Sequence, residues 1–333
     1  MTKLKSSLLL LTLTLNAYSS TKVIYGEDNR VDVFESTNSQ YVELSKSTAA
    51  MIPSYKVKEI NSYEVELGGT TLEQRGMCAS EKFSQQPTTA NCSGFLVDKD
   101  KLVTAGHCIK TQSDCDGSVW VFDFKVEYSD QSKVVVDKSS VYKCKKIISQ
   151  SLDSSTQNDY AFIELEKVVT DRKPLKLRKS GKAQVGDKLV VIGHPTGLPT
   201  KIADGASVRK VNDIYFTANL DTYGGNSGSA VFNATTGLIE GILVRGDTDY
   251  VYDSSQGCQV SNVIGNSVGR GEDVTLIGNI KELMALDIDY GDEPTQDDTV
   301  SDDDSSSDDS TQDTQDEDPY AHLPAWLRWW LGL

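Results

Sequence analysis

Three short motifs contain the residue types that acyl transfer from a peptide requires. This chemistry needs a nucleophile, a base that returns the proton, a group that orients the base, and donors directed at the oxyanion. Of the three histidines, His322 lies in the C-terminal tail and His194 lies in a turn-like Gly-His-Pro-Thr-Gly sequence. His107 directly follows an apolar run, within Thr-Ala-Gly-His-Cys at 104–108. A lone histidine is usually structural, but this setting makes His107 the candidate base.

The candidate nucleophile is Ser227, in the sequence Gly-Gly-Asn-Ser-Gly-Ser at 224–229. Glycines at such a site let backbone N–H groups approach a substrate carbonyl without an intervening side chain. A stretch rich in glycine and serine is usually only a turn. This one separates two strand-like runs, where a plain turn rarely needs so many small residues.

The candidate orienting acid is Asp159, which is one of 49 acidic residues. It leads into the apolar run 161–165, so that it lies at the mouth of an expected strand and can be buried beneath a histidine. An ordinary turn aspartate is the alternative interpretation. The order histidine, aspartate, serine differs from that of α/β-hydrolases and of subtilisin-type enzymes. Position 229 is also Ser, so the motif does not match G-x-S-x-G.

The rest of the chain predicts an all-β protein. Short β-rich runs are separated by clusters of Gly, Asp, Asn and Pro, the pattern of a sandwich or barrel. Only 45–52 and 279–286 are predicted to be helical. The predicted strands are 31–34, 63–67, 94–97, 102–104, 119–126, 161–165, 188–192, 214–218, 229–232, 238–244 and 274–277.

The N-terminus has the features of a secretory signal peptide, predicted over 1–20. Lys3 and Lys5 precede an apolar stretch at 8–15 and a small-residue cleavage site at 17–19. All six cysteines follow this segment, and an even number behind an export signal predicts three disulfides. A zinc site is the competing interpretation, but no two cysteines have C-x-x-C spacing. We therefore expect a secreted protein, extracellular or periplasmic.

The formal charge of −16 is concentrated near the C-terminus, because 287–318 contains 15 acidic and no basic residues. Residues 291–318 are predicted to be a disordered acidic linker, since they contain almost nothing apolar. Residues 319–333 form a tryptophan-rich tail that could contact a membrane surface or envelope. No basic surface is predicted, which argues against nucleic-acid binding.

Taken together, the motifs at 104–108, 158–161 and 224–229 resemble those of the chymotrypsin-fold serine proteases, in particular the bacterial trypsin-like and glutamyl endopeptidase branch. The resemblance spans about 23–290. It implies two antiparallel six-stranded Greek-key barrels with a short C-terminal helix, and a peptidase domain over 21–290. The first barrel is expected at about 23–170 and the second at about 175–290. No cofactor or metal is implied, and we expect a monomer that acts on protein or peptide substrates.

The resemblance also assigns roles to the residues of the three motifs. His107 is the general base, Asp159 orients it, Ser227 attacks, and the N–H groups of Gly225 and Ser227 form the oxyanion hole. Among the cysteines, Cys92 and Cys108 match the disulfide that the family places across the histidine loop. We suggest Cys115 with Cys144, since both flank neighbouring strand-like runs, which leaves Cys78 with Cys258.

Primary specificity stays open between two classes. Asp221 matches the position where trypsin-like enzymes keep a negative charge, which favours cleavage after Arg or Lys, unless its side chain points elsewhere or Arg245 neutralises it. Thr222 matches a residue of glutamyl endopeptidases, but the histidine that they also need falls at Leu243. Gly246 matches a glycine that lines the substrate cleft.

Two further departures concern activation and size. The residue before the nucleophile is Asn226, so that it cannot form the activating ion pair of trypsin-like zymogens. The sequence from Val23 still resembles a mature N-terminus, freed by cleavage after Lys22. The segment before His107 is also long, which predicts an inserted subdomain around 41–90. The sequence thus predicts a serine endopeptidase, with a non-catalytic binding protein on the same fold as the alternative.

Overall fold

The computed structural model describes residues 23–290. The predictions made for 1–20, 291–318 and 319–333 lie outside the described residues. Within the described part, no helix combines the length and the apolar character that crossing a membrane requires.

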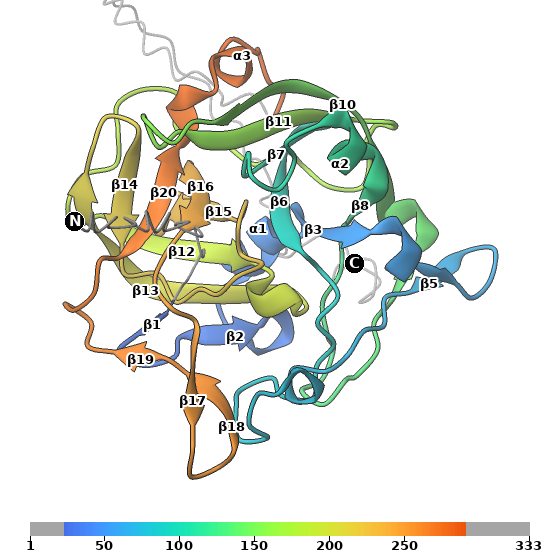
Figure 1. Ribbon diagram of the computed structural model, residues 1–333. Coiled ribbons are helices and arrows are strands. Elements are labelled where there is room, and N and C mark those ends of the chain that lie inside the picture. The colour runs from blue at the N-terminus through green and yellow to red at the C-terminus, as the bar shows by residue number, and fades with distance from the viewer. Residues whose placement is uncertain (1–22, 291–333) are drawn as a thin grey trace, which may run out of the picture. The chain divides into compact units, whose positions relative to one another are not determined.

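Six antiparallel strands close into a first barrel, in the order β3, β6, β7, β11, β10, β8 (Figure 1). The strands are β3 (Thr48–Pro53), β6 (Cys92–Asp98), β7 (Lys101–Thr104), β8 (Ser118–Val121), β10 (Val141–Leu152) and β11 (Asp159–Leu165). A short helix, α2 (Gln112–Gly117), precedes β8.

A second barrel repeats the same topology later in the chain. Its strands are β12 (Lys188–Gly193), β13 (Lys201–Val211), β14 (Tyr215–Ala218), β15 (Ala230–Asn233), β16 (Ile239–Arg245) and β20 (Glu272–Leu276). Strand β12 pairs with both β13 and β15, which closes the barrel. In each barrel the first three strands pair in sequence and the third then pairs with the sixth. The predicted fold class is confirmed.

One hydrophobic cluster spans the two barrels, beside separate clusters within each of them. Trp120 and Phe95 of the first barrel belong to the same buried cluster as Phe232 and Ile242 of the second, and none of the four side chains is exposed. Burial of such large apolar side chains is a main driving force of folding. The core therefore fixes the two barrels against each other, together with the loops between them.

The N-terminal segment attaches to the second barrel, although it was counted with the first. Strand β2 (Arg30–Asp32) pairs with β13, and β1 (Ile24–Tyr25) runs parallel to β19 (Val263–Ile264). Val23, Ile24 and Tyr25 are buried. The residues that follow Lys22 are thus built into the fold.

The predicted helix at 45–52 is wrong. Helix α1 is Ser39–Ser45, and the run that follows is the barrel strand β3. The Asn38 side chain accepts from the N–H groups of Gln40 and Tyr41, which starts the helix earlier. All six residues of β3 are buried between β6 and β8, and this pairing outweighs the helical preference of the two alanines. The C-terminal helix is found as α3 (Lys281–Met284).

Because β3 belongs to the barrel, an insertion over the whole of 41–90 is also wrong. The additional structure begins after Pro53. It contains β4 (Lys58–Glu59) and β5 (Glu64–Glu66), which form a small sheet with β9 (Val135–Asp137). A long loop then leads to β6, and a disulfide from this loop reaches the hairpin of β17 (Tyr250–Asp253) and β18 (Cys258–Ser261).

All six cysteines are in disulfides, in the pairs expected from the sequence. The bonds are Cys78–Cys258, Cys92–Cys108 and Cys115–Cys144. Such a set is typical of proteins that fold outside the reducing cytoplasm.

Candidate functional site

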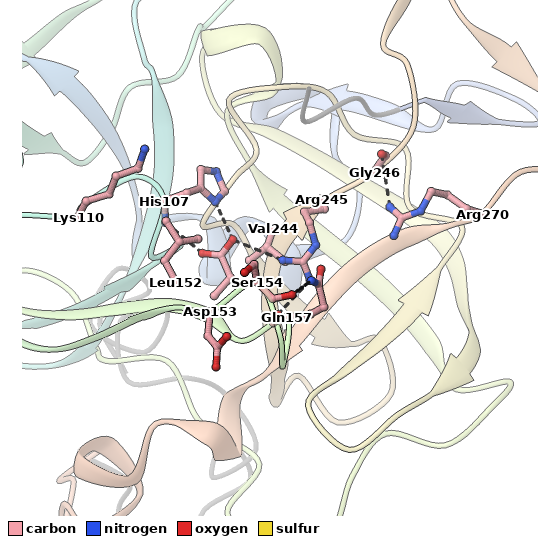
Figure 2. A pocket seen from close by; sticks show the side chains of 11 residues that line it. His107, Lys110, Leu152, Asp153, Ser154, Gln157, Val244, Arg245, Gly246 and Arg270 are labelled. Carbon is pink, nitrogen blue, oxygen red and sulfur yellow. Dashed lines mark hydrogen bonds and ion pairs between the residues drawn. The ribbon is translucent and has the colours of Figure 1, made fainter. Parts of the chain in front are cut away.

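A cleft of about 630 Å³ contains two of the predicted catalytic side chains, His107 and Asp159 (Figure 2). His107 follows β7 and Asp159 begins β11, neighbouring strands of the first barrel. The other wall of the cleft includes Val244 and Gly246, at the end of β16 in the second barrel. The site therefore lies where the barrels meet.

Two hydrogen bonds fix the imidazole on the carboxylate. His107 Nδ1 lies 2.8 Å from Asp159 Oδ2, and the backbone N–H of His107 donates to Oδ1 over 3.1 Å. The Asp159 side chain is only 3% exposed, whereas that of His107 is 27% exposed. A buried carboxylate that holds a partly open imidazole fixes the ring tautomer, with Nε2 left as the acceptor for a proton.

The glycine of the histidine motif is required by a close approach. A Cβ added to Gly106 would lie 2.0 Å from the carbonyl oxygen of Ser151 and 2.8 Å from that of Tyr160. No other residue type lets the loop pack this tightly against β10 and β11. This contact brings His107 over Asp159.

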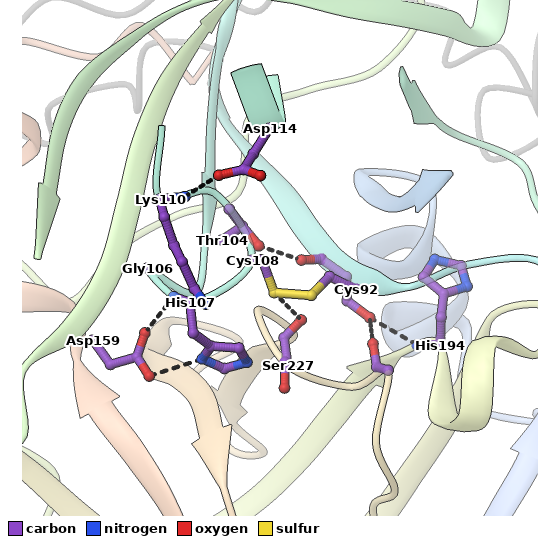
Figure 3. Close-up of a disulfide and its surroundings, with 12 residues drawn as sticks. Cys92, Thr104, Gly106, His107, Cys108, Lys110, Asp114, Asp159, His194 and Ser227 are labelled. Carbon is purple, nitrogen blue, oxygen red and sulfur yellow. Dashed lines mark hydrogen bonds and ion pairs between the residues drawn. A yellow bond between two sulfur atoms is a disulfide. The ribbon is translucent and has the colours of Figure 1, made fainter. Parts of the chain in front are cut away.

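Ser227 comes from the second barrel, in the loop between β14 and β15. Its carbonyl accepts from the backbone N–H of Ser93 over 2.8 Å and lies 3.7 Å from Cys108 Sγ. A ring nitrogen of His107 lies within 4.8 Å of that sulfur. Figure 3 draws Ser227 next to the His107 ring, on the side away from Asp159. The structure thus brings the three residues predicted as catalytic into one site.

The two predicted oxyanion donors are unengaged. Within residues 23–290, the N–H groups of Gly225 and Ser227 make no hydrogen bond, whereas those of Asn226, Gly228 and Ser229 all do. Ser227 is buried and Gly225 is partly buried, and N–H groups without a partner in the protein are available to an oxygen of a ligand. They are suited to an oxygen that gains negative charge.

Gly225 cannot be replaced without disturbing this loop. Its φ is +93°, and an added Cβ would lie 2.6 Å from the His194 carbonyl oxygen and 2.7 Å from the Gly197 nitrogen. Both the backbone angle and the close contacts require glycine.

Ser93, which the sequence analysis missed, supports the same loop from the first barrel. Its hydroxyl donates to the Gly225 carbonyl over 2.9 Å and accepts from the His194 N–H over 3.0 Å. It is fully buried in β6. A polar residue directly after Cys92, in an otherwise apolar run, was the available signal, since a buried hydroxyl needs partners.

The second described histidine, His194, is buried and stacked on Phe124. Burial lowers its pKa to about 3, so that the ring is neutral at ordinary pH. Its Nδ1 lies 3.1 Å from the Leu198 carbonyl. His194 therefore stabilises the turn beneath Gly225 and does not exchange protons at the cleft.

The three residues predicted to form the specificity pocket are not all together. Asp221 accepts from the backbone N–H groups of Tyr25 and Asn29, over 2.7 and 3.0 Å. Burial raises the pKa of Asp221 to about 6. Thr222 and Gly246 instead both contact Glu272, a residue that the sequence analysis did not single out.

Arg245 does not neutralise Asp221 either. Its Nη1 lies 3.7 Å from Asp159 Oδ2, and its Nε lies 3.1 Å from Asp273. Its Nη2 donates to the Gln157 carbonyl over 3.0 Å. This arginine thus lies at the end of the cleft that holds Asp159 and His107.

The sulfurs of Cys92 and Cys108 approach His107 closely enough for a metal site, with all three ligand atoms within 4.8 Å of one another. The two sulfurs are bonded to each other, however. Disulfide sulfurs are not thiolates, so this group does not fit a zinc ion.

Residues 92–242 match the family model of the trypsin-like peptidase domain. Solved structures similar to the chain at 14% identity include the VesB protease of Vibrio cholerae, with a TM-score of 0.45 over 77% of this chain and 65% of that one. They also include a Glu endopeptidase, with a TM-score of 0.42 over 79% and 97%. A third is the Rv3671c protease of M. tuberculosis in its active form, with a TM-score of 0.41 over 84% and 93%. No curated protein sequence matches the chain.

Proposed function

Because residues 92–242 match the trypsin-like peptidase domain, we propose that the chain is a chymotrypsin-fold member of this family and a secreted serine endopeptidase that cuts after basic residues. The observation that carries the proposal is the pair of hydrogen bonds by which Asp159 holds His107. Ser227 lies next to that imidazole, and two unengaged N–H groups belong to the same loop as Ser227.

The reaction follows from this arrangement. His107 Nε2 takes the proton from the Ser227 hydroxyl as Oγ attacks the scissile carbonyl, and the same nitrogen then gives the proton to the leaving amine. Asp159 keeps the ring in the required tautomer and stabilises the imidazolium that forms. Water repeats the sequence on the acyl-enzyme, with His107 as the base and Ser227 as the leaving group.

The N–H groups of Gly225 and Ser227 stabilise the negative oxygen of each tetrahedral intermediate. Since these two N–H groups have no other hydrogen-bond partner among the described residues, they need no rearrangement when the negative charge develops. Loss of one such donor typically lowers kcat by about 100- to 1000-fold.

The three disulfides and the signal-like N-terminus support a site of action outside the cytoplasm. We further propose a monomeric peptidase domain over 21–290, whose mature chain begins at Val23. The burial of Val23 and Ile24 supports a defined position for this end. Intact-mass analysis of active enzyme tests the start, and a stable chain that begins at Thr21 would refute it.

The proposed function is tested by incubating disulfide-bonded protein with a mixed peptide library. Ser227→Ala removes the nucleophile, and Ser154→Ala is the matched control, since Ser154 is also a serine of the cleft. We expect internal cuts by the wild type and the control but none by Ser227→Ala. An absence of cuts from correctly processed wild type would favour a non-catalytic binding protein on the same fold.

A further inference from the structure

Two buried carboxylates, Asp221 and Glu272, belong to or contact the predicted specificity pocket, and they have different hydrogen-bond partners. Both oxygens of Asp221 accept backbone N–H groups of the N-terminal segment, from Tyr25 and Asn29. Like Glu272, it is not one of the residues that line the cleft itself, and no glycine of the cleft wall is described against its carboxylate. Asp221 therefore anchors the N-terminal segment.

Glu272, the first residue of β20, lies between the other two predicted pocket residues. It is fully buried. Its Oε2 accepts from the Thr222 hydroxyl over 3.0 Å, and its Oε1 accepts from the Asp247 N–H over 3.3 Å. Thr222 belongs to the same loop as the proposed nucleophile, Ser227.

Only a glycine separates this carboxylate from the cleft. A Cβ added to Gly246 would lie 1.9 Å from Glu272 Oε2 and 2.3 Å from Oε1. The carboxylate therefore packs directly against the Gly246 backbone, and Gly246 lines the cleft together with His107. No side chain at position 246 covers the carboxylate.

Asp273, the next residue along β20, forms ion pairs with two arginines of the protein. Asp273 pairs with Arg245 over 3.1 Å and with Arg270 over 2.7 Å. Successive side chains of a strand point to opposite faces, so Glu272 is directed toward Thr222, although its charge still acts on Arg270. The strand thus presents one carboxylate to the arginines and one to the pocket wall.

We propose that Glu272, and not Asp221, is the carboxylate that recognises the substrate side chain before the scissile bond, and that it selects arginine or lysine. The inference rests on the proposed serine endopeptidase function and names the residue that sets its specificity. A carboxylate in a site shielded from water pairs most favourably with a guanidinium or ammonium group, because charge-assisted hydrogen bonds are the strong ones.

The test compares two peptide series that differ only in having arginine or glutamine before the scissile bond. The enzymes are the mature wild type, Glu272→Gln, and Asp221→Asn as the matched control, since Asp221 is the other buried carboxylate near the pocket. We expect Glu272→Gln to lose the arginine-over-glutamine ratio of kcat/KM by about 100-fold or more. Asp221→Asn should keep the ratio within about threefold of the wild-type value.

A fluorophosphonate that labels an activated serine separates the two proposals. Absence of labelling in the wild type would refute the proposed function. If all three enzymes are labelled, two results would overturn only the role of Glu272. One is that Glu272→Gln keeps the preference for arginine over glutamine, and the other is that Asp221→Asn loses it. So would a labelled wild type that does not prefer basic residues.

If Glu272→Gln does not fold, a second measurement decides. Benzamidine carries a cationic amidinium, and benzamide is its neutral counterpart. We expect benzamidine, but not benzamide, to protect wild type and Asp221→Asn equally from the fluorophosphonate. Loss of this protection in Asp221→Asn would assign the charge to Asp221 and overturn the inference.

Discussion

Nη1 of Arg245 lies 3.7 Å from Oδ2 of Asp159, the same oxygen that lies 2.8 Å from His107 Nδ1. The oriented carboxylate is thus shared between the imidazole and a fixed cation. The same guanidinium donates to the Gln157 carbonyl over 3.0 Å, so that it ties Asp159 to the loop just before it. Arg245 is therefore a positioning residue for Asp159.

Replacing this arginine is expected to lower activity by loosening Asp159. Arg245→Met removes the donor to the Gln157 carbonyl and the cation beside Asp159, so kcat/KM is expected to fall by about tenfold. Asp273 keeps Arg270 as a partner. Lys182→Met is the control, since Lys182 pairs with the fully exposed Asp213. Equal kcat/KM values for the two variants in steady-state assays would contradict the role of Arg245.

The oxyanion loop is expected to tolerate no side chain at Gly225. In Gly225→Ala the added Cβ displaces the loop from His194 and Gly197, and kcat/KM falls by about 100-fold or more. Gly76→Ala is a matched control, because Gly76 has a φ of +95° but no atom within 4 Å of an added Cβ. Steady-state kinetics of both variants separates the contact from the backbone strain. Equal activities of the two variants would contradict the requirement for glycine at position 225.

The three disulfides are expected to differ in their contributions to stability. Cys78–Cys258 spans 180 residues and Cys115–Cys144 spans 29. Since a cross-link restricts the unfolded chain more when the loop is longer, loss of the first costs about 5 kcal/mol and loss of the second about 3.5 kcal/mol. Urea unfolding of the double-serine variants, in a Ser227→Ala background that prevents autolysis, measures the difference. A larger loss for Cys115–Cys144 would contradict this order.

Acid is expected to destabilise the protein through His194. Its pKa falls from 6.5 to about 3 on folding, with burial as the main cause. The unfolded chain therefore binds the proton first, and stability is lost as pH falls from about 6.5 toward 3, by at most about 5 kcal/mol.

The test is urea unfolding of His194→Asn between pH 7 and 4, again in the Ser227→Ala background. Asparagine keeps a donor for the Leu198 carbonyl but cannot be protonated. Its free energy of unfolding is expected to fall less steeply with acid, by up to about 1.4 kcal/mol per pH unit. Parallel slopes for His194→Asn and its parent would refute the assignment.

The sequence motifs predicted those features that depend on residue type and on the order of residues along the chain, namely several barrel strands and the positions of the candidate site residues. Barrel strands such as β6, β7 and β11 follow from alternating apolar runs bounded by turn residues, and the positions of His107 and Asp159 follow from them. Strand β3 did not follow, because Thr-Ala-Ala-Met-Ile has no strong local preference. Its state is set by pairing with β6 and β8, which lie far along the chain.

The pocket was less predictable than the catalytic residues for a similar reason. Where Asp221 and Glu272 point depends on which segment packs beside them, and the partners Tyr25 and Thr222 are distant in sequence. Ser93 was missed because a serine within a strand usually faces solvent, and only the fold places it under Gly225.

The division of the site between two barrels also sets when a growing chain can become active. His107, Asp159 and Ser93 belong to the first barrel, and Ser227 belongs to the second. The second barrel is complete only when its last strand, β20, has been added, and that strand ends at Leu276. Under the proposed function, a chain in which only the first barrel has folded holds the base without the nucleophile. Activity could then appear only after the second barrel has closed, so a partly made chain would have no complete catalytic site.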